Sequence, residues 1–234
     1  MSVLLVAGAG EGLGRAIAQR FAREGYVAAL VARDGTKLQA LASKVGGQAF
    51  PADLSREAEV ISLYERVERT LGAIDVVAFV AATRIIGPFT EITLEDFERV
   101  WRQSTASGFL VGREAARRML VRGRGTILFT GASGSLRGNP NFAAFAAAKG
   151  GLRFMAQSMA RELGPKGIHV ATVLLDGAID SPMMWREHRE RMEKLGADGA
   201  IDPDAAAQAY WQLHCQPRNA WTFELDLRPW TQPW

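Results

Sequence analysis

The chain has 234 residues, of which 48% are hydrophobic and 23% charged, and its net charge is +3. This is enough apolar material for one compact core, and the scattered positive charge excludes the basic stripe typical of nucleic-acid-binding proteins. The apolar runs are shorter than the roughly 20 residues that cross a bilayer, and no basic segment precedes the first run, so we expect neither a membrane span nor a secretory signal. With one cysteine, Cys215, and no histidines at ligand spacing, we expect a cytoplasmic protein without a metal site.

Short apolar runs alternate with amphipathic segments from the first residues onward. The run at residues 3–7 predicts a buried strand, and Leu13, Ile17 and Phe21 recur at the spacing of a helix that ends at Gly25. A second apolar run follows at residues 26–32. Strand, helix and strand within about thirty residues form the unit of a parallel sheet, because a parallel neighbour requires a crossover connection.

The alternation continues to residue 174. We predict helices at residues 37–45, 55–71, 94–121 and 142–163, and strands at 48–51, 75–82, 126–130 and 169–174. From Val76 onward the strand at 75–82 is apolar on both faces, which is typical of strands covered by helices on each side. The sequence therefore predicts one α/β domain over residues 1–234, a three-layer, doubly wound Rossmann fold with a mainly parallel sheet of six to seven strands.

The C-terminal segment breaks this rhythm. Residues 176–234 carry five of the six tryptophans. We interpret residues 182–200 as a helical flap beside the site and residues 216–234 as a tail that packs on the sheet edge or on a partner subunit; simple core aromatics are the alternative. Met183, Met184 and Trp185 favour a mobile apolar lid over a small-molecule substrate with an apolar or aromatic part.

A glycine-rich motif, GAGEGLG at residues 8–14, follows the first strand directly and precedes the first helix. In this position backbone N–H groups and the helix N-terminus can face a pyrophosphate, and a side chain would block the approach. We therefore expect a dinucleotide to be bound by Gly8, Gly10, Gly12, Leu13 and Gly14. A glycine turn that only packs the helix on the sheet is the alternative.

The glycine spacing, with RAIA at residues 15–18, resembles that of the short-chain dehydrogenase/reductase family. The resemblance extends to about residue 185 through DL at 53–54, IDVV at 74–77 and GAIDSP at 177–182. It implies an oxidoreductase that transfers a hydride between a nicotinamide cofactor and a carbonyl or alcohol. It also implies a homodimer or homotetramer built on the helices at 94–121 and 142–163, and further cofactor contacts from Asp53, Leu54, Ala81, Lys149, Ile179 and Ser181.

The end of the second predicted strand indicates which dinucleotide is bound. An NAD site carries an acid there for the ribose 2′-hydroxyl, whereas a 2′-phosphate requires a cation. In the family that the chain resembles, the acid would stand at Ala32, and arginine at the position of Arg33 accompanies NADP. We therefore favour NADP over NAD, although Asp34 would restore an acid after a shift of one residue.

The catalytic positions depart from the pattern of that family. There a tyrosine four residues before a lysine protonates the substrate oxygen, and a serine thirteen residues upstream of the tyrosine binds the same oxygen. Here Lys149 is present, but Phe145 and Ala132 stand at the tyrosine and serine positions, and Ser104 replaces a helix asparagine. The residues that hold the nucleotide are kept, and those that protonate a substrate are not.

Three functional hypotheses remain open. In the first, which we favour, the chain is an NADP-dependent oxidoreductase with a degenerate acid site, whose acid has moved to Asp176, Ser133 or Thr130, with Ser104, Thr83 and Arg84 lining the pocket. In the second, it is a non-catalytic NADP-binding sensor or regulatory subunit. In the third, the substrate is activated enough to need no strong acid, and orientation supplies most of the rate.

Overall fold

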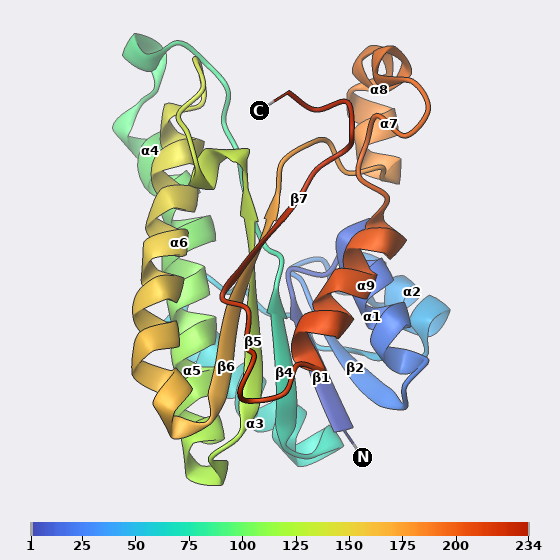
Figure 1. Cartoon of the computed structure of the whole chain (residues 1–234), viewed down its shortest axis with the longest axis vertical. Helices are drawn as coiled ribbons and strands as arrows, with labels where there is room; N and C mark the ends of the chain where they lie inside the picture. Colours follow the sequence, from blue (N-terminus) through green and yellow to red (C-terminus); the bar gives the residue numbers. More distant parts are fainter. Residues whose placement is uncertain (1, 234) are drawn as a thin grey trace.

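The sheet has seven parallel strands, and the computed structural model describes residues 2–233. The strands are β1 (Ser2–Ala7), β2 (Tyr26–Val31), β3 (Gln48–Ala49), β4 (Ile74–Phe79), β5 (Gly125–Ala132), β6 (Ile168–Leu175) and β7 (Glu224–Leu227). The helices are α1 (Leu13–Ala22), α2 (Gly35–Val45), α3 (Glu57–Leu71), α4 (Leu94–Trp101), α5 (Ser107–Arg122), α6 (Ala143–Leu163), α7 (Pro182–Glu187), α8 (Arg189–Leu195) and α9 (Pro203–His214). The strand order β3-β2-β1-β4-β5-β6-β7 confirms the predicted doubly wound Rossmann fold (Figure 1).

Helices cover both faces of the sheet because neighbouring strand residues point to opposite faces. On β1, Leu5 belongs to the core under α3, α5 and α6, whereas Leu4 belongs to the core under α1, α2 and α9. Val77 and Val76 divide in the same way on β4. All four side chains are fully buried. The central strands are therefore apolar on both faces, as the continuous apolar runs predict.

The strand order reverses between β1 and β4, which places a crevice at the carboxyl ends of these two strands. The chain leaving β4 crosses the end of β1: the backbone N–H groups of Val80 and Ala81 both donate to the carbonyl oxygen of Ala7, at 2.9 and 3.0 Å. The segment after β1 turns toward β2, since the N–H groups of Gly8 and Ala9 donate to Val31. The glycine-rich motif and the loop after β4 therefore meet at this edge.

The helix predicted at residues 94–121 contains an irregular turn. α4 ends at Trp101, residues Arg102–Ala106 form a π-helical turn, and α5 continues to Arg122. The wider turn contains Ser104, whose hydroxyl accepts from the backbone N–H of Thr83 at 3.4 Å. Such turns are frequent at functional sites. Sequence periodicity alone did not predict this turn, because one added residue per turn leaves the apolar pattern almost unchanged.

The C-terminal segment adds two elements that the sequence did not define. α9 packs Ala206, Ala207, Tyr210 and Leu213 onto the sheet beside α1. β7 pairs in parallel with β6, with Leu225 opposite Val173. Within residues 2–233, no helix is long and apolar enough to cross a membrane.

Candidate cofactor site and active site

The glycine turn is shaped by close backbone approach. Gly8 has a φ of +94°, and a Cβ there would lie 2.5 Å from the Cα of Ala81, so only glycine lets the two loops cross. A Cβ at Gly14 would lie 2.9 Å from the Cα of Ala9, whereas Gly10 has open space around it. Gly12 precedes α1 without a side-chain cap. An uncapped helix N-terminus beside an open glycine suits a phosphate group, so these residues fit a dinucleotide.

The two charged residues that follow β2, Arg33 and Asp34, have different environments. Asp34 caps α2: it accepts from the backbone N–H of Lys37 at 3.1 Å and pairs with the Lys37 ammonium at 3.3 Å. These hydrogen bonds lower the pKa of Asp34. Arg33 is exposed and forms no hydrogen bond or ion pair with another residue in the described part of the chain. The free charge at this strand end is therefore positive.

Asp53 lies after β3 and is oriented by its own turn. Its carboxylate accepts from the backbone N–H of Ser55 at 3.0 Å and from the hydroxyl of Ser55 at 2.7 Å. Burial acts to raise the pKa of Asp53, but these hydrogen bonds and the charges of Arg33 and Arg56 outweigh it, and the pKa is lowered. Leu54, the second residue of the predicted pair, is buried.

Lys149 is buried on α6, with 2% of its surface exposed. Its ammonium donates to the backbone oxygen of Thr130 at 2.8 Å. Burial lowers the pKa of Lys149 to about 8, because the charged form loses its water. Phe145 lies one helical turn earlier, where its ring packs over the turn at Gly134. The position that would carry a phenol therefore carries a side chain without a proton to donate.

The two hydroxyl candidates after β5 have different environments. The Ser133 side chain is half-buried and forms no hydrogen bond with another described residue. Thr130 is buried, and its hydroxyl is 2.6 Å from that of Tyr210 on α9. The hydroxyl of Thr130 is thus occupied on the α9 side, and Ser133 is the freer of the two.

Asp176 is bound as a carboxylate between two arginines. Both of its oxygens accept from Arg137, at 3.0 and 2.9 Å, and Arg228 lies 3.3 Å away. Arg228 also pairs with Asp226 at 2.6 Å. Because a proton donor must be protonated and two guanidinium groups bind the ionised form, the structure favours an anchoring role for Asp176 over that of the relocated acid. Neither arginine was singled out from the sequence, where no motif spacing connects them to Asp176.

The segment after β6 returns to the glycine turn. Ser181 is buried and caps α7, accepting from the backbone N–H of Met184 at 3.3 Å. A Cβ at Gly12 would lie 3.0 Å from the Cβ of Ser181, so the two residues are in contact. Ile179 forms a parallel bridge with Ile201. The structure thus brings Ser181 and the glycines together, as the cofactor prediction requires.

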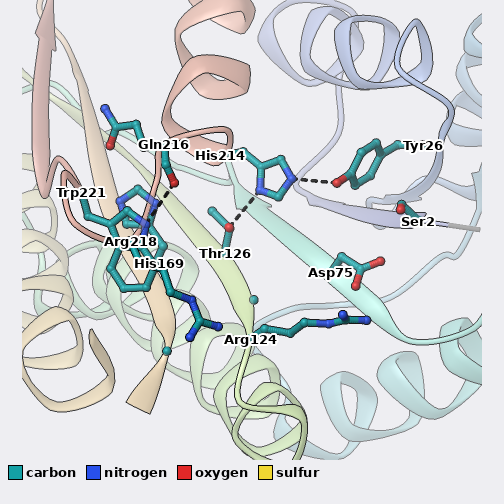
Figure 2. A pocket seen from close by; sticks show the side chains of 12 residues that line it. Ser2, Tyr26, Asp75, Arg124, Thr126, His169, His214, Gln216, Arg218 and Trp221 are labelled. Atoms are coloured by element: carbon teal, nitrogen blue, oxygen red, sulfur yellow. Dashed lines mark hydrogen bonds between the residues drawn. The ribbon is translucent and has the colours of Figure 1, made fainter. Parts of the chain in front are cut away.

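A polar pocket of about 380 Å³ lies at the opposite, amino-terminal edge of the strands (Figure 2). There His214 of α9 lies between the hydroxyl of Tyr26, at 2.7 Å, and that of Thr126, at 2.9 Å. Burial lowers the pKa of His214 and of His169, which stacks on Trp221 at 4.8 Å. No residue of the predicted site lines this pocket. Ligands of doubly wound sheets bind at the carboxyl ends of the strands, so the candidate active site is the crevice at the other edge.

Comparisons with known proteins agree with this geometry. A model of the short chain dehydrogenase family matches residues 2–192. A short-chain dehydrogenase/reductase of Armillaria gallica is 37% identical over 189 residues, which cover 77% of this chain and 72% of that protein. The human 3-oxoacyl-[acyl-carrier-protein] reductase is 30% identical over 202 residues, covering 84% and 85%.

Two solved structures are similar over nearly the whole chain. The short-chain dehydrogenase from Rhodopseudomonas palustris is 40% identical with a TM-score of 0.83, covering 98% of this chain and 99% of that one. The 3-ketoacyl-(acyl-carrier-protein) reductase from Brucella melitensis, complexed with NADH, is 25% identical with a TM-score of 0.89, covering 99% and 98%.

Proposed function

We propose that this chain, which belongs to the short-chain dehydrogenase/reductase family and is an oxidoreductase of that type, transfers a hydride between NADP(H) and a carbonyl or alcohol substrate. The family match confirms the resemblance inferred from the sequence motifs. The observation that carries the proposal is the open, uncapped glycine turn at the same edge of the sheet as the buried Lys149.

The residues around the glycine turn fit a phosphorylated dinucleotide. Gly10 and the N-terminus of α1 would hold the pyrophosphate, and Asp53 and Ser181 would flank it. Arg33 supports NADP, since it is an unpaired cation at the end of β2, while the neighbouring acid, Asp34, is used to cap α2. NADPH supplies the hydride when it is bound.

Lys149 is the group best suited to give the proton to a substrate oxygen. Its pKa of about 8 keeps the ammonium protonated at neutral pH and makes it a stronger acid than an exposed lysine. One of its three N–H groups is used by Thr130, which leaves two for a cofactor hydroxyl and a substrate. Ser133, whose hydroxyl has no partner among the described residues, could orient the same substrate oxygen, whereas Phe145 only forms part of the wall of the substrate site.

A second function has one observation in its favour. Phe145 and Ala132 replace both side chains that act on the substrate oxygen in the family, so a non-catalytic NADP-binding sensor or regulatory subunit is the alternative. Both functions require coenzyme binding, and they differ in turnover.

The first experiment titrates NADPH and NADH against the full chain by fluorescence. We expect NADPH to bind about tenfold or more tightly than NADH, and Arg33→Ala to remove that preference, because a charge-assisted phosphate contact contributes on the order of 1.5 to 3 kcal/mol. Absence of binding by either coenzyme at millimolar concentration would refute both functions.

The second experiment follows NADPH consumption from pH 6 to 10 over a carbonyl panel that includes a 3-oxoacyl thioester, as two of the similar proteins are 3-oxoacyl or 3-ketoacyl reductases. With Lys149 as acid, the rate should fall as the pH rises through about 8, where the ammonium loses its proton. Phe145→Tyr, which adds a phenol of higher pKa, should extend activity to higher pH and raise it about tenfold or more. Tight NADPH binding without consumption by any variant would instead support the sensor function.

A further inference from the structure

The flap, residues 182–200, is attached to the domain at a narrow base. The backbone N–H of Ile201 donates to Ala178 at 2.7 Å, and that of Asp180 donates to Ile201 at 2.8 Å. Met184 of α7 and Met192 of α8 pack with Ala178 in a small cluster separate from both sheet cores. The flap therefore has its own apolar contacts and is joined to the domain beside Ala178 and Ile201.

The two ends of α7 contact opposite sides of the crevice. At its start, Ser181 touches Gly12 of the glycine turn. After its end, Nε2 of His188 lies 3.0 Å from Nη2 of Arg84, on the loop after β4. Figure 1 shows α7 and α8 beyond the carboxyl ends of the strands. The flap thus spans the crevice from the β1 side to the β4 side.

Arg84 is a half-buried cation without an ion-pair partner within residues 2–233, since the nearby Glu187 pairs with Arg186 at 3.7 Å. It forms no ion pair, and because a guanidinium only donates, His188 must accept as a neutral imidazole nitrogen. Burial and the charge of Arg191 lower the pKa of Arg84, against the opposing effect of Glu187. Leaving a desolvated charge without a counter-ion is unfavourable.

Three other arginines near this edge form ion pairs. Arg137 and Arg228 bind Asp176, and Arg153 forms a bidentate pair with Glu224 at 2.6 and 2.7 Å. Arg84 also follows Thr83, whose N–H and hydroxyl contact the π-helical turn. It is therefore positioned by the same loop that crosses the end of β1, under the flap.

We propose that Arg84 binds an anionic oxygen group of the substrate, a carboxylate or a phosphate, beneath the flap. This inference rests on the proposed function, because the anion that Arg84 would bind belongs to the same substrate as the carbonyl that is reduced. The planar guanidinium can offer two parallel N–H groups to such an anion while His188 holds a third. The substrate class is then an oxo acid or a phosphorylated carbonyl compound, with any apolar part against the flap methionines.

The test measures binding of matched ligand pairs to the full chain saturated with NADP⁺, by calorimetry. Phenylpyruvate is compared with phenylpyruvamide, and glyceraldehyde 3-phosphate with glyceraldehyde. We expect the anionic member of at least one pair to bind about tenfold or more tightly than its neutral partner, and the pair that discriminates identifies carboxylate or phosphate. Arg84→Gln should reduce the ratio to within about twofold, and Arg84→Lys should retain part of it.

Arg161→Gln is the matched control, because Arg161 is an exposed cation on α6 whose side chain, within residues 2–233, hydrogen-bonds only to the backbone of Gln157. It changes the net charge equally and should leave the ratio unchanged. Equal binding within both pairs, failure of both anions to bind at millimolar concentration, or a ratio that survives Arg84→Gln would overturn the inference. If a variant folds poorly, the ratio of anionic to neutral ligand affinity in the unmodified chain still tests the inference.

Failure of the proposed function has a different signature. If NADP⁺ does not bind, the hydride-transfer proposal fails, and the same pairs titrated against the coenzyme-free chain still test Arg84. If NADP⁺ binds but charge discrimination is absent, only the anion subsite fails.

Discussion

The contacts of the Asp176 carboxylate indicate a structural role for this residue and not a catalytic one. Its side chain is 1% exposed and its two oxygens are used by Arg137 and Arg228. Pro229, the residue after Arg228, lies against Gly177: a Cβ on Gly177 would be 2.7 Å from the proline ring. The ion pairs therefore attach the C-terminal segment to the turn after β6, at the substrate end of the crevice.

Asp176→Asn should destabilise the chain by about 2 to 4 kcal/mol, because it leaves Arg137 without its carboxylate and removes one of the two carboxylates that Arg228 contacts. Chemical denaturation measures the loss, and limited proteolysis should detect release of the residues after β7.

Asp226→Asn is the matched control for that change. Asp226 pairs with the same Arg228, but its side chain is 30% exposed, so we expect a cost below about 1 kcal/mol. If Asp176→Asn kept full stability and abolished only NADPH consumption, Asp176 would be the acid and the anchoring role would be wrong.

Among the elements, the end of α9 is joined to two strands by one imidazole. His214 contacts Tyr26 at the start of β2 and Thr126 at the start of β5 (Figure 2). Burial lowers the pKa of His214; the charge of His169 acts in the same direction and that of Asp75 opposes it. The folded chain therefore holds His214 neutral at a pH where the unfolded chain begins to protonate it.

Stability should fall as the pH drops below about 6.5, the ordinary value for histidine, and level off below the lowered pKa of the folded state. The sign follows because the unfolded state binds more protons in this window. Urea denaturation at pH 7.5 and 5.5 measures the slope.

His214→Asn should cost about 1 to 3 kcal/mol at pH 7.5 by removing two partly buried hydrogen bonds. It should also reduce the pH dependence, leaving the part due to His169, whose pKa is lowered by burial as well. An unchanged pH dependence in this variant would show that His214 does not carry the effect.

At the scale of the whole molecule, two long helices expose aromatic side chains. Phe109 of α5 is 46% exposed and Phe154 of α6 is 66% exposed. Along α6 the exposed or half-exposed residues Ala147, Gly151 and Phe154 recur at helical spacing, which makes one small and apolar outer face. Homo-oligomers bury such faces against their own copies about a twofold axis.

We therefore expect a homodimer or homotetramer in light scattering coupled to gel filtration. The double change Phe109→Glu and Phe154→Glu should produce monomers, because burying unpaired like charges at a twofold interface is strongly unfavourable. Arg23→Glu, at the exposed end of α1 on the other face of the sheet, serves as a charge control. A monomeric unmodified chain would contradict the prediction.

The alternating apolar runs were enough to predict the doubly wound sheet, because the apolar pattern of each central strand and helix is visible within a few consecutive residues. The glycine motif was predicted for the same reason: its position between a strand and a helix requires no knowledge of distant residues. α9 and β7 were not defined, since their stability comes from α1 and from the edge of β6, which are remote in sequence.

Sequence by itself determined the fold class, the family and the residues that replace the usual acid, since each follows from local pattern or residue identity. Only the tertiary structure decided which charges are used and which are free. Asp34 caps a helix, Asp176 binds two arginines, and Arg33 and Arg84 form no ion pair among the described residues. The physical reason is that an ion pair depends on distance in space and on the loss of water, and neither is encoded in the spacing of residues along the chain.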